Sequence, residues 1–189
     1  MDGDTFINCL EQIVGKDSAN RYAQRFGNLD ESFTDTLLNY EGLAFYAYST
    51  ELNWHERINR ELWSDSPGAD VVTFAKVLDT ALEKLPPYAL NDRVVYRGYN
   101  CDDLDRFLAS YPLAERVHFR GFTSATFRQE LAFGGNVLFI IKTSTGKAIW
   151  HLAANYDEFE ILIPSSRHFR VLQVERRSAS AVIFLEEQP

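Results

Sequence analysis

The chain has 189 residues, 46% of them apolar, with two cysteines and a net charge of −8 at pH 7, which excludes a disordered chain and a disulfide scaffold. The acidic surplus falls within residues 1–90, which carry 15 acidic and 7 basic side chains. Non-specific binding to nucleic acid depends on neutralising phosphates, so an acidic chain without a basic run is poorly suited to it.

Residues 1–88 show the apolar spacing of helices. The 3.6-residue period predicts five helices: one through 6–14, one that starts at 18–20 and contains Tyr22 and Phe26, one over 34–48, one that begins after Asn53, and one that Asp70 caps and 86–87 terminate. Two consecutive prolines end the last of these helices because proline cannot continue the helical hydrogen bonding.

From residue 89 onward the pattern changes to short β-type runs, interrupted by one expected helix over 101–110. The expected strands cover 93–97, 116–122, 136–143, 147–152, 158–163, 168–175 and 180–186. A block of helices followed by a block of strands indicates an α+β fold. We therefore predict a single domain over 1–189, with a helical layer over about 1–88 and a β-rich core over about 89–189.

Cys9 and Cys101 match no metal-ligand spacing and indicate neither a zinc site nor a disulfide. The first residues are acidic and lack the basic and apolar regions of a signal peptide. The longest apolar runs, such as 137–141, are much shorter than the roughly 20 residues of a membrane helix. We expect a cytoplasmic protein without a membrane partner, and any delivery into a host or target cell would proceed without a cleavable signal peptide.

Two glutamates flank Phe159 at the start of a predicted strand. Strand alternation would place Glu158 and Glu160 on one face, with Cα atoms about 6.6 Å apart. Two unit charges at that distance repel by about 2.5 kcal/mol at an effective dielectric of 20. Such a pair is expected either on a solvated strand face, where water screens the repulsion, or at the edge of a cleft where the pair performs chemistry.

An arginine and a run of hydroxyls are two further candidate features. Arg97 closes an apolar strand, and Gly98 after it would let the backbone approach a ligand closely. The planar guanidinium of arginine suits a phosphate because it can bond two oxygens at once. Ser124 and Thr126 belong to the hydroxyl-rich run 123–126. Each feature alone is ordinary, since strand-end arginines are commonly just exposed and hydroxyl runs commonly form turns.

Taken in this order, the three features resemble the arginine-serine-glutamate class of mono-ADP-ribosyltransferases, which occurs in bacterial toxins and effectors and in vertebrate arginine-modifying enzymes. That family shows an Arg-Gly that closes a first strand, an S-T-S segment, and an E-x-E on a later strand. The matching segments are 97–98, 124–126 and 158–160, and the similarity extends over roughly 48–175. Phe133 falls where toxin members carry an aromatic in the loop that covers nicotinamide.

The resemblance implies an ADP-ribosyltransferase-like α+β fold, with the N-terminal helices packed on a mixed, mainly antiparallel two-sheet β core. It implies NAD as the substrate and no metal. Cleavage of the bond between nicotinamide and ribose creates positive charge on the ribose, which a fixed carboxylate can stabilise. By resemblance this role falls to Glu160, with Ser124 orienting it, while Glu158 binds and orients the acceptor. A carboxylate can bind a guanidinium in bidentate fashion, so the acceptor implied is an arginine.

The same resemblance assigns the binding of NAD. Arg97 would hold the pyrophosphate beside Gly98, together with the segment of Ser124 and Thr126. Phe133 would either stack on nicotinamide or serve as an apolar packing residue of the loop. Two departures from the family are Ala125 in the middle of S-T-S, which removes one hydroxyl, and 135–136 where toxins commonly carry a basic residue; Arg128 is the candidate substitute.

Four functions stay open from the sequence. The first is a mono-ADP-ribosyltransferase that modifies arginine on a protein, as a bacterial effector or toxin. The second is the same fold acting on another acceptor, such as nucleic acid, or hydrolysing NAD. The third is an inactive member that binds a partner through its acidic helical half, and the fourth is an unrelated hydrolase that uses the carboxylate pair. The partners implied are NAD, a target protein that presents an arginine, and an immunity or activating protein; nucleic acid and membrane are not expected.

Overall fold

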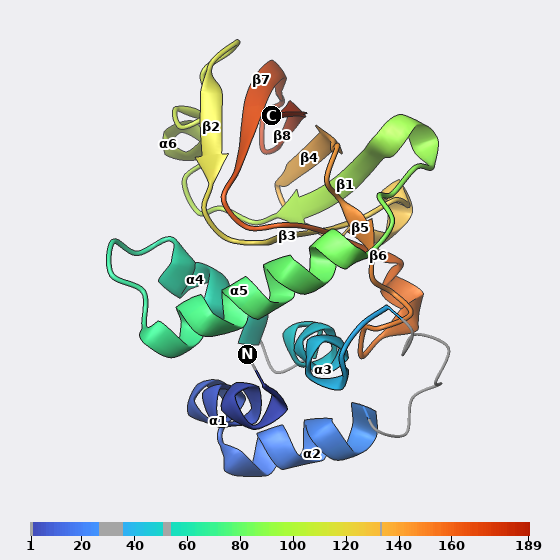
Figure 1. Ribbon diagram of the computed structural model, residues 1–189. Helices are drawn as coiled ribbons and strands as arrows, with labels where there is room; N and C mark the ends of the chain where they lie inside the picture. The colour runs from blue at the N-terminus through green and yellow to red at the C-terminus, as the bar shows by residue number, and fades with distance from the viewer. Residues whose placement is uncertain (1, 27–35, 51–53, 133) are drawn as a thin grey trace. The chain divides into compact units, whose positions relative to one another are not determined.

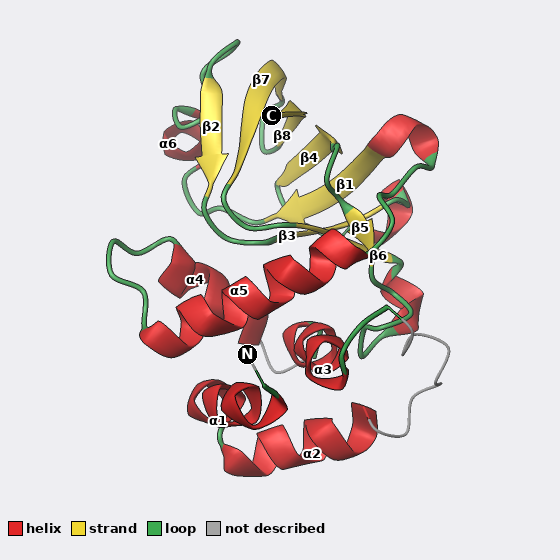
Figure 2. Cartoon of the chain, viewed as in Figure 1, coloured by secondary structure: helices red, strands yellow, loops and turns green. Residues whose placement is uncertain are grey.

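The computed structural model describes residues 2–26, 36–50, 54–132 and 134–189. The chain forms two compact units: a helical unit of residues 1–86 with 149–157, and a sheet unit of residues 87–148 with 158–189. Figure 1 follows the chain by colour from one end to the other, and Figure 2 shows helices concentrated in the first unit and strands in the second. The change of secondary structure predicted near residue 88 lies two residues after the unit boundary at residue 86, and residues 149–157, predicted in the β-rich part, belong to the helical unit.

Five α-helices make up most of the helical unit, as predicted. They are α1 (Gly3–Val14), α2 (Lys16–Phe26), α3 (Asn39–Tyr48), α4 (Trp54–Leu62) and α5 (Ala69–Lys84). The expected cap of the fifth helix at Asp70 is wrong, because Gly68 is the N-cap and Asp70 lies in the first turn, where a negative charge suits the helix dipole. Part of the third expected helix, 34–35, lies outside the described residues. Within the described ranges no helix is long and apolar enough to cross a bilayer.

An apolar core and the ion pair between Lys84 and Glu41 help to hold the helical unit. Helix α5 packs against α1, α3 and α4. Lys84 Nζ lies 2.7 Å from both carboxylate oxygens of Glu41, whose side chain is buried. Glu41 also accepts a hydrogen bond from the Leu38 N–H at 2.9 Å and so caps the start of α3. Segment 149–157 joins this unit through the Ala154 N–H, which donates to Ser49 Oγ at 2.8 Å.

Eight strands make up the sheet unit in the order β2-β7-β8-β4-β1-β3-β6-β5 (Figure 1). They are β1 (Val94–Tyr99), β2 (Arg116–Phe119), β3 (Thr123–Thr126), β4 (Val137–Lys142), β5 (Lys147–Ala148), β6 (Glu160–Ile163), β7 (Arg167–Arg176) and β8 (Ala181–Gln188). Only β4 and β8 pair in parallel; every other described pair is antiparallel. The predicted α+β class with a mixed, mainly antiparallel β core is confirmed.

Hydrogen bonding runs through all eight strands, so the two sheets expected from the resemblance are a single sheet. The connection is narrow, because β1 and β3 share one register pair, Tyr96 with Thr126. A five-stranded part, β2-β7-β8-β4-β1, and a three-stranded part, β3-β6-β5, therefore join at one point.

Other strand predictions differ from the structure in length and number. The run 147–152 yields only the two-residue β5, because residues 150–152 form a turn. Strand β3 was not predicted, since its sequence Thr-Ser-Ala-Thr has no large apolar residue. The helix expected over 101–110 shortens to α6 (Leu104–Leu108), and short 3₁₀ turns cover η2 (Asn91–Arg93), η3 (Gln129–Leu131) and η4 (Tyr156–Glu158).

An aromatic cluster fills one part of the sheet unit. Phe139 on β4 contacts Phe107, Tyr111 and Phe119 at centroid distances of 6.2, 5.5 and 6.2 Å, and Phe119 lies 4.8 Å from Phe169 on β7. Burial raises the pKa of Tyr111. Alternation along β4 and β8 supplies the aliphatic part of the core, with Val137, Ile141, Ala181, Ile183 and Leu185 buried.

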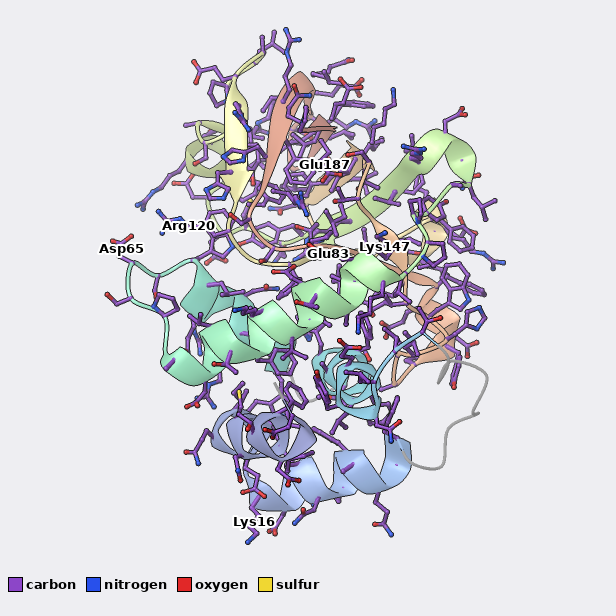
Figure 3. The ribbon with its side chains drawn as sticks, viewed as in Figure 1. Lys16, Asp65, Glu83, Arg120, Lys147 and Glu187 are labelled. Carbon is purple, nitrogen blue, oxygen red and sulfur yellow. The ribbon has the colours of Figure 1, made fainter. Side chains whose placement is uncertain are left out.

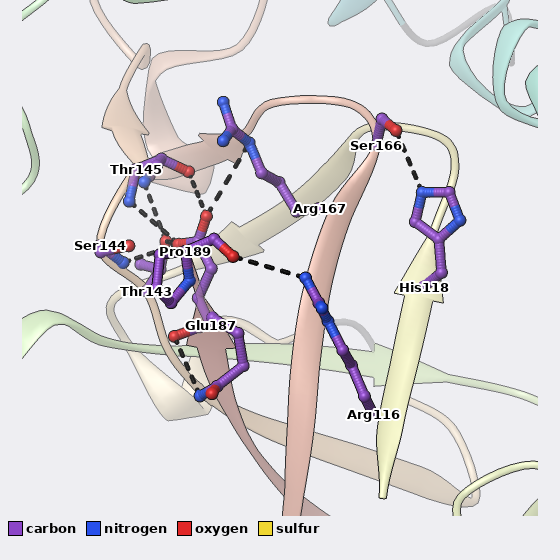
Figure 4. A network of polar contacts seen from close by, with 11 residues as sticks. Arg116, His118, Thr143, Ser144, Thr145, Ser166, Arg167, Glu187 and Pro189 are labelled. Atoms are coloured by element: carbon purple, nitrogen blue, oxygen red, sulfur yellow. Dashed lines mark hydrogen bonds and ion pairs between the residues drawn. The ribbon is translucent and has the colours of Figure 1, made fainter.

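Glu187 near the end of β8 anchors the turn that follows β4 (Figures 3 and 4). Its buried carboxylate accepts hydrogen bonds from Thr143 Oγ1 and Ser144 N, both at 2.7 Å, and from the N–H and hydroxyl of Thr145 at 3.0 and 2.5 Å. Arg167 Nε lies 3.9 Å from it. Burial alone would raise the pKa of Glu187, but the hydrogen bonds from Thr145, Thr143 and Ser144 hold it below its ordinary value. The ionised carboxylate therefore fixes the β4–β5 turn to β8.

Candidate functional site

The ladder between β3 and β6 brings Ser124 and Glu160 together. These strands are antiparallel, with Ser124 opposite Leu162 and Thr126 opposite Glu160. Ser124 and Glu160 are thus diagonal neighbours on one face, where side chains can reach each other. Ser124 Oγ donates a hydrogen bond to Glu160 Oε1 at 2.6 Å. Thr126 is also opposite Tyr96, so this pair lies where β1, β3 and β6 meet.

The carboxyl group of Glu160 is buried, and its neighbours shift its pKa. Only 4% of the residue is exposed, and burial raises its pKa to about 7. The hydrogen bond from Ser124 acts to lower the pKa, the charge of Glu158 raises it further, and the charge of Arg97 lowers it. Little water screens this carboxylate, so a positive charge that develops beside it is stabilised more than it would be in solution.

Arg97 lies next to this pair on β1. Its Nη1 donates to the backbone carbonyl of Ser124 at 2.7 Å, and the residue is half-buried. This bond engages one of the five N–H donors of the guanidinium and fixes its orientation. Gly98 follows on β1, opposite Leu138 of β4. The arrangement can present a fixed positive charge to an anion beside Glu160.

Glu158 does not lie on the strand that carries Glu160, and that part of the prediction is wrong. Strand β6 begins at Glu160, whereas Glu158 ends the 3₁₀ turn η4. Phe159 between them has φ of 48°, in the left-handed region, which interrupts the extended backbone. Strand alternation therefore does not set the direction of Glu158. Its charge still raises the pKa of Glu160, so the two carboxylates interact electrostatically.

The left-handed backbone of Phe159 is supported by two ring contacts. Its ring meets Phe127 edge to face at 5.5 Å, and the Arg128 Cζ lies 4.1 Å from its centroid. A left-handed conformation in a residue other than glycine costs about 1–3 kcal/mol. An edge-to-face pair contributes about 0.5–1.5 kcal/mol, and the cation–π contact of an exposed arginine contributes about 0.5–1 kcal/mol. The two contacts together are comparable in size to the strain.

Arg128 is exposed and lies two residues after the end of β3. Its backbone N–H donates to Thr126 Oγ1 at 3.3 Å, while its guanidinium covers the ring of Phe159 and lies 5.7 Å from the ring of Phe127. The sequence suggested Arg128 as a phosphate ligand. The structure shows in addition that its guanidinium stacks on Phe159, the residue between Glu158 and Glu160, which the sequence pattern did not indicate. Phe133, the expected partner of nicotinamide, lies outside the described residues.

The loop after residue 133 is fixed against the end of β1. A Cβ at Gly135 would collide with the backbone carbonyl of Tyr99, so only glycine permits this close approach. Asn136 then accepts a hydrogen bond from the Cys101 N–H at 3.0 Å and donates to the Cys101 carbonyl at 2.8 Å. Gly135 thus serves a packing role against the strand that carries Arg97.

Ala125, the departure from the S-T-S pattern, lies on the opposite face of β3 from Ser124. It is buried opposite Ile161, whereas Ser124 and Thr126 share the face of Glu160. A hydroxyl at position 125 would point away from the carboxylate. The substitution therefore leaves the hydrogen bond between Ser124 and Glu160 in place.

Sequence reasoning missed the aromatic support of this site. Phe127 stacks on Tyr88 at 6.2 Å and also contacts Phe159, which links the start of the sheet unit to the E-x-E turn. The only sequence signal for this support is the aromatic Phe159 inside E-x-E together with Arg128, four residues after Ser124. This signal does not by itself predict that the two side chains stack. Among the described residues no group of three histidine, cysteine, aspartate or glutamate side chains gathers where it could hold a metal ion.

Comparison with known proteins gives the family of the chain. A family model described as NAD:arginine ADP-ribosyltransferase matches residues 11–189. Mav of Mycobacterium avium (strain 104), whose name gives NAD(+)–arginine ADP-ribosyltransferase as a provisional assignment, is 28% identical over 179 residues, which are 90% of this chain and 21% of Mav. The chain thus spans about a fifth of the length of this curated relative.

Two solved structures extend the comparison to the fold. XopAI, a type III effector of Xanthomonas axonopodis pv. citri, is 20% identical and matches with a TM-score of 0.81 over 99% of this chain and 87% of its own. The ADP-ribosyltransferase Vis of Vibrio splendidus, solved in complex with agmatine, is 25% identical with a TM-score of 0.67 over 90% of this chain and 82% of its own. The likeness to XopAI shows a shared fold.

Proposed function

The chain belongs to the NAD:arginine ADP-ribosyltransferase family, and we propose that it transfers ADP-ribose from NAD to an arginine side chain of a target protein, with release of nicotinamide. The observation that carries this proposal is the hydrogen bond of 2.6 Å between Ser124 and the buried Glu160, beside the guanidinium of Arg97. These are the residues that the family resemblance assigns to catalysis and to the pyrophosphate.

The reaction needs a fixed negative charge near the ribose. When the bond between the ribose C1 and the nicotinamide nitrogen breaks, nicotinamide leaves with the electron pair and positive charge builds on the ribose. Glu160, held by Ser124, stabilises that charge, and Arg97 binds the pyrophosphate. A nitrogen of the acceptor guanidinium then bonds to C1 and loses a proton.

Glu158 supports the choice of an arginine acceptor. Its carboxylate lies two residues before Glu160 and can receive a guanidinium in bidentate fashion. Vis, a structural neighbour at 25% identity, was solved with agmatine, which carries the same guanidinium group as arginine. We extend the proposal to action as a bacterial effector or toxin in the cytoplasm of a target cell, supported by the resemblance of the three motifs to toxin members.

The proposal is tested by incubating the chain with NAD and agmatine in the presence of a metal chelator. We expect nicotinamide release to increase with agmatine concentration and mass spectrometry to show agmatine heavier by one ADP-ribosyl group. Nicotinamide release without any agmatine product would indicate an NAD glycohydrolase. ADP-ribose found on added oligonucleotides but not on agmatine or protein would replace the arginine assignment, and no binding of NAD would contradict the enzyme assignment.

The pKa of Glu160 predicts how hydrolysis of NAD depends on pH. With a pKa of about 7 the carboxyl is mostly protonated at pH 6 and mostly ionised at pH 8. If the ionised form is the active one, kcat/KM for NAD hydrolysis rises about tenfold between these pH values. Initial rates of nicotinamide release at subsaturating NAD measure this profile. A flat profile, or one that falls with pH, contradicts the assignment of Glu160 as the catalytic carboxylate.

A further inference from the structure

Glu158 and Glu160 are held by different parts of the sheet unit. Glu160 belongs to the β3–β6 ladder and bonds Ser124, so its position is set by strand pairing. Glu158 ends η4 outside the ladder, and the backbone of Phe159 sets its direction relative to Glu160. A feature that holds Phe159 therefore affects the direction of Glu158, while the ladder and the bond to Ser124 hold Glu160.

Phe159 is held from one side by residues that directly follow β3. Its ring meets Phe127 at 5.5 Å with an interplanar angle of 72°, and the Arg128 guanidinium carbon lies 4.1 Å from its centroid. Thr126 accepts a hydrogen bond from the Arg128 N–H at 3.3 Å and is itself the register partner of Glu160. The end of β3 thus connects to the E-x-E turn in two ways, through the ladder and through the stack.

A φ of 48° is unusual for a phenylalanine and persists only where the surroundings favour it. Arginine suits the contact because the flat face of its guanidinium lies on the ring while its N–H donors point outward along the edges. Arg128 remains exposed to solvent in the stack. Loss of the stack would release the turn toward ordinary backbone conformations.

We propose that Arg128 and Phe159 form a positioning pair that holds Glu158 toward the acceptor and so sets how much ADP-ribose goes to arginine rather than to water. The proposal rests on the proposed function, because it concerns the partition of that reaction. Neither residue touches the reacting atoms, and both affect transfer through the direction of Glu158. Water needs no carboxylate to dock it, so hydrolysis of NAD depends on Glu160 and not on the pair.

The test compares Phe159→Leu and Arg128→Gln with the wild type in three measurements: transfer to agmatine, hydrolysis of NAD, and KM for NAD. We expect both variants to lose transfer by about tenfold, and Phe159→Leu to keep hydrolysis within about threefold with KM for NAD unchanged. The double variant should lose no more than either single one, because both substitutions break the same contact. Phe159→Tyr keeps the aromatic ring and, unlike Phe159→Leu, should retain transfer.

Arg170→Gln is the matched control, since Arg170 is an exposed arginine on β7. It should change none of the three measurements. If Arg128→Gln raises KM for NAD and lowers hydrolysis and transfer equally, Arg128 is a phosphate ligand and the positioning role is overturned. Additive losses in the double variant, or full transfer by both single variants, also overturn it.

A measurement without catalysis separates this proposal from the proposed function. Amide hydrogen exchange over 156–160 in the free protein should be faster in Phe159→Leu and Arg128→Gln than in the wild type and in Arg170→Gln. Faster exchange in a chain that shows no transfer would place the failure in the proposed function, whereas unchanged exchange in both variants would overturn the positioning pair.

Discussion

Replacement of Glu160 by glutamine is expected to reduce both hydrolysis of NAD and transfer of ADP-ribose by about a thousandfold, or about 4 kcal/mol of transition-state stabilisation. The substitution removes the charge that opposes the ribose cation and changes the side-chain volume very little. Ser124 Oγ can still donate to the amide oxygen in place of the carboxylate, so the local hydrogen bond survives. Nicotinamide release and agmatine labelling, each measured at saturating NAD, give the two activities.

Stability provides the control for this variant. The folded-state pKa of Glu160, about 7, lies above its ordinary value of 4.5, so the ionised carboxylate is disfavoured by folding. Its burial therefore lowers the free energy of unfolding as pH rises from about 4.5 to about 7, and the loss is complete above pH 7. At pH 8 the unfolding midpoint of Glu160→Gln should be no lower than that of the wild type. At pH 5 the two midpoints should differ less.

Glu115→Gln serves as the matched substitution, because Glu115 is an exposed glutamate outside the site. It should leave both activities and their pH dependence unchanged. Near-normal nicotinamide release from folded Glu160→Gln would remove Glu160 from the catalytic role. A large drop in the unfolding midpoint at pH 8 would instead attribute the loss of activity to the fold.

The helices and most strands could be predicted because their apolar periodicity reflects what they bury. α5 shows this directly, since Phe74, Leu78 and Leu82 recur every four residues and all are buried. β3 could not be predicted by the same argument. Its buried residues include Thr123 and Thr126. Threonine is not counted as apolar, so a search for apolar periodicity does not detect this strand.

The candidate site shows a similar division. The resemblance of three motifs to a known family identified Arg97, Ser124 and Glu160 as candidates, and strand register places the serine and the glutamate within a hydrogen bond of each other. The direction of Glu158 could not be predicted, because it depends on the positive φ of Phe159. Three-dimensional ring contacts support that backbone, and a sequence pattern contains no information about which rings meet.

Glu158 carries the acceptor assignment, and its replacement by glutamine should separate two activities that Glu160→Gln removes together. We expect Glu158→Gln to lose transfer to agmatine by at least tenfold, equivalent to about 1.4 kcal/mol, because a neutral amide cannot form a charge-assisted bidentate bond with a guanidinium. Hydrolysis of NAD should persist, since water requires no such docking. Rates of agmatine labelling and of nicotinamide release in the absence of acceptor measure the two effects.

The pH profile supplies a second readout for the same variant, and a loss of folding would not reproduce it. The negative charge of Glu158 raises the pKa of Glu160, so its removal should lower that pKa and move the rise of hydrolysis to lower pH. At pH 6 the variant should then hydrolyse NAD faster than the wild type. Equal loss of both activities with an unshifted profile would mean that Glu158 supports the ribose or the local fold. Full retention of transfer to agmatine would mean that Glu158 does not bind the acceptor guanidinium. Transfer to nucleic acid but not to agmatine, at a rate that falls steeply with salt, would identify a nucleic-acid acceptor instead.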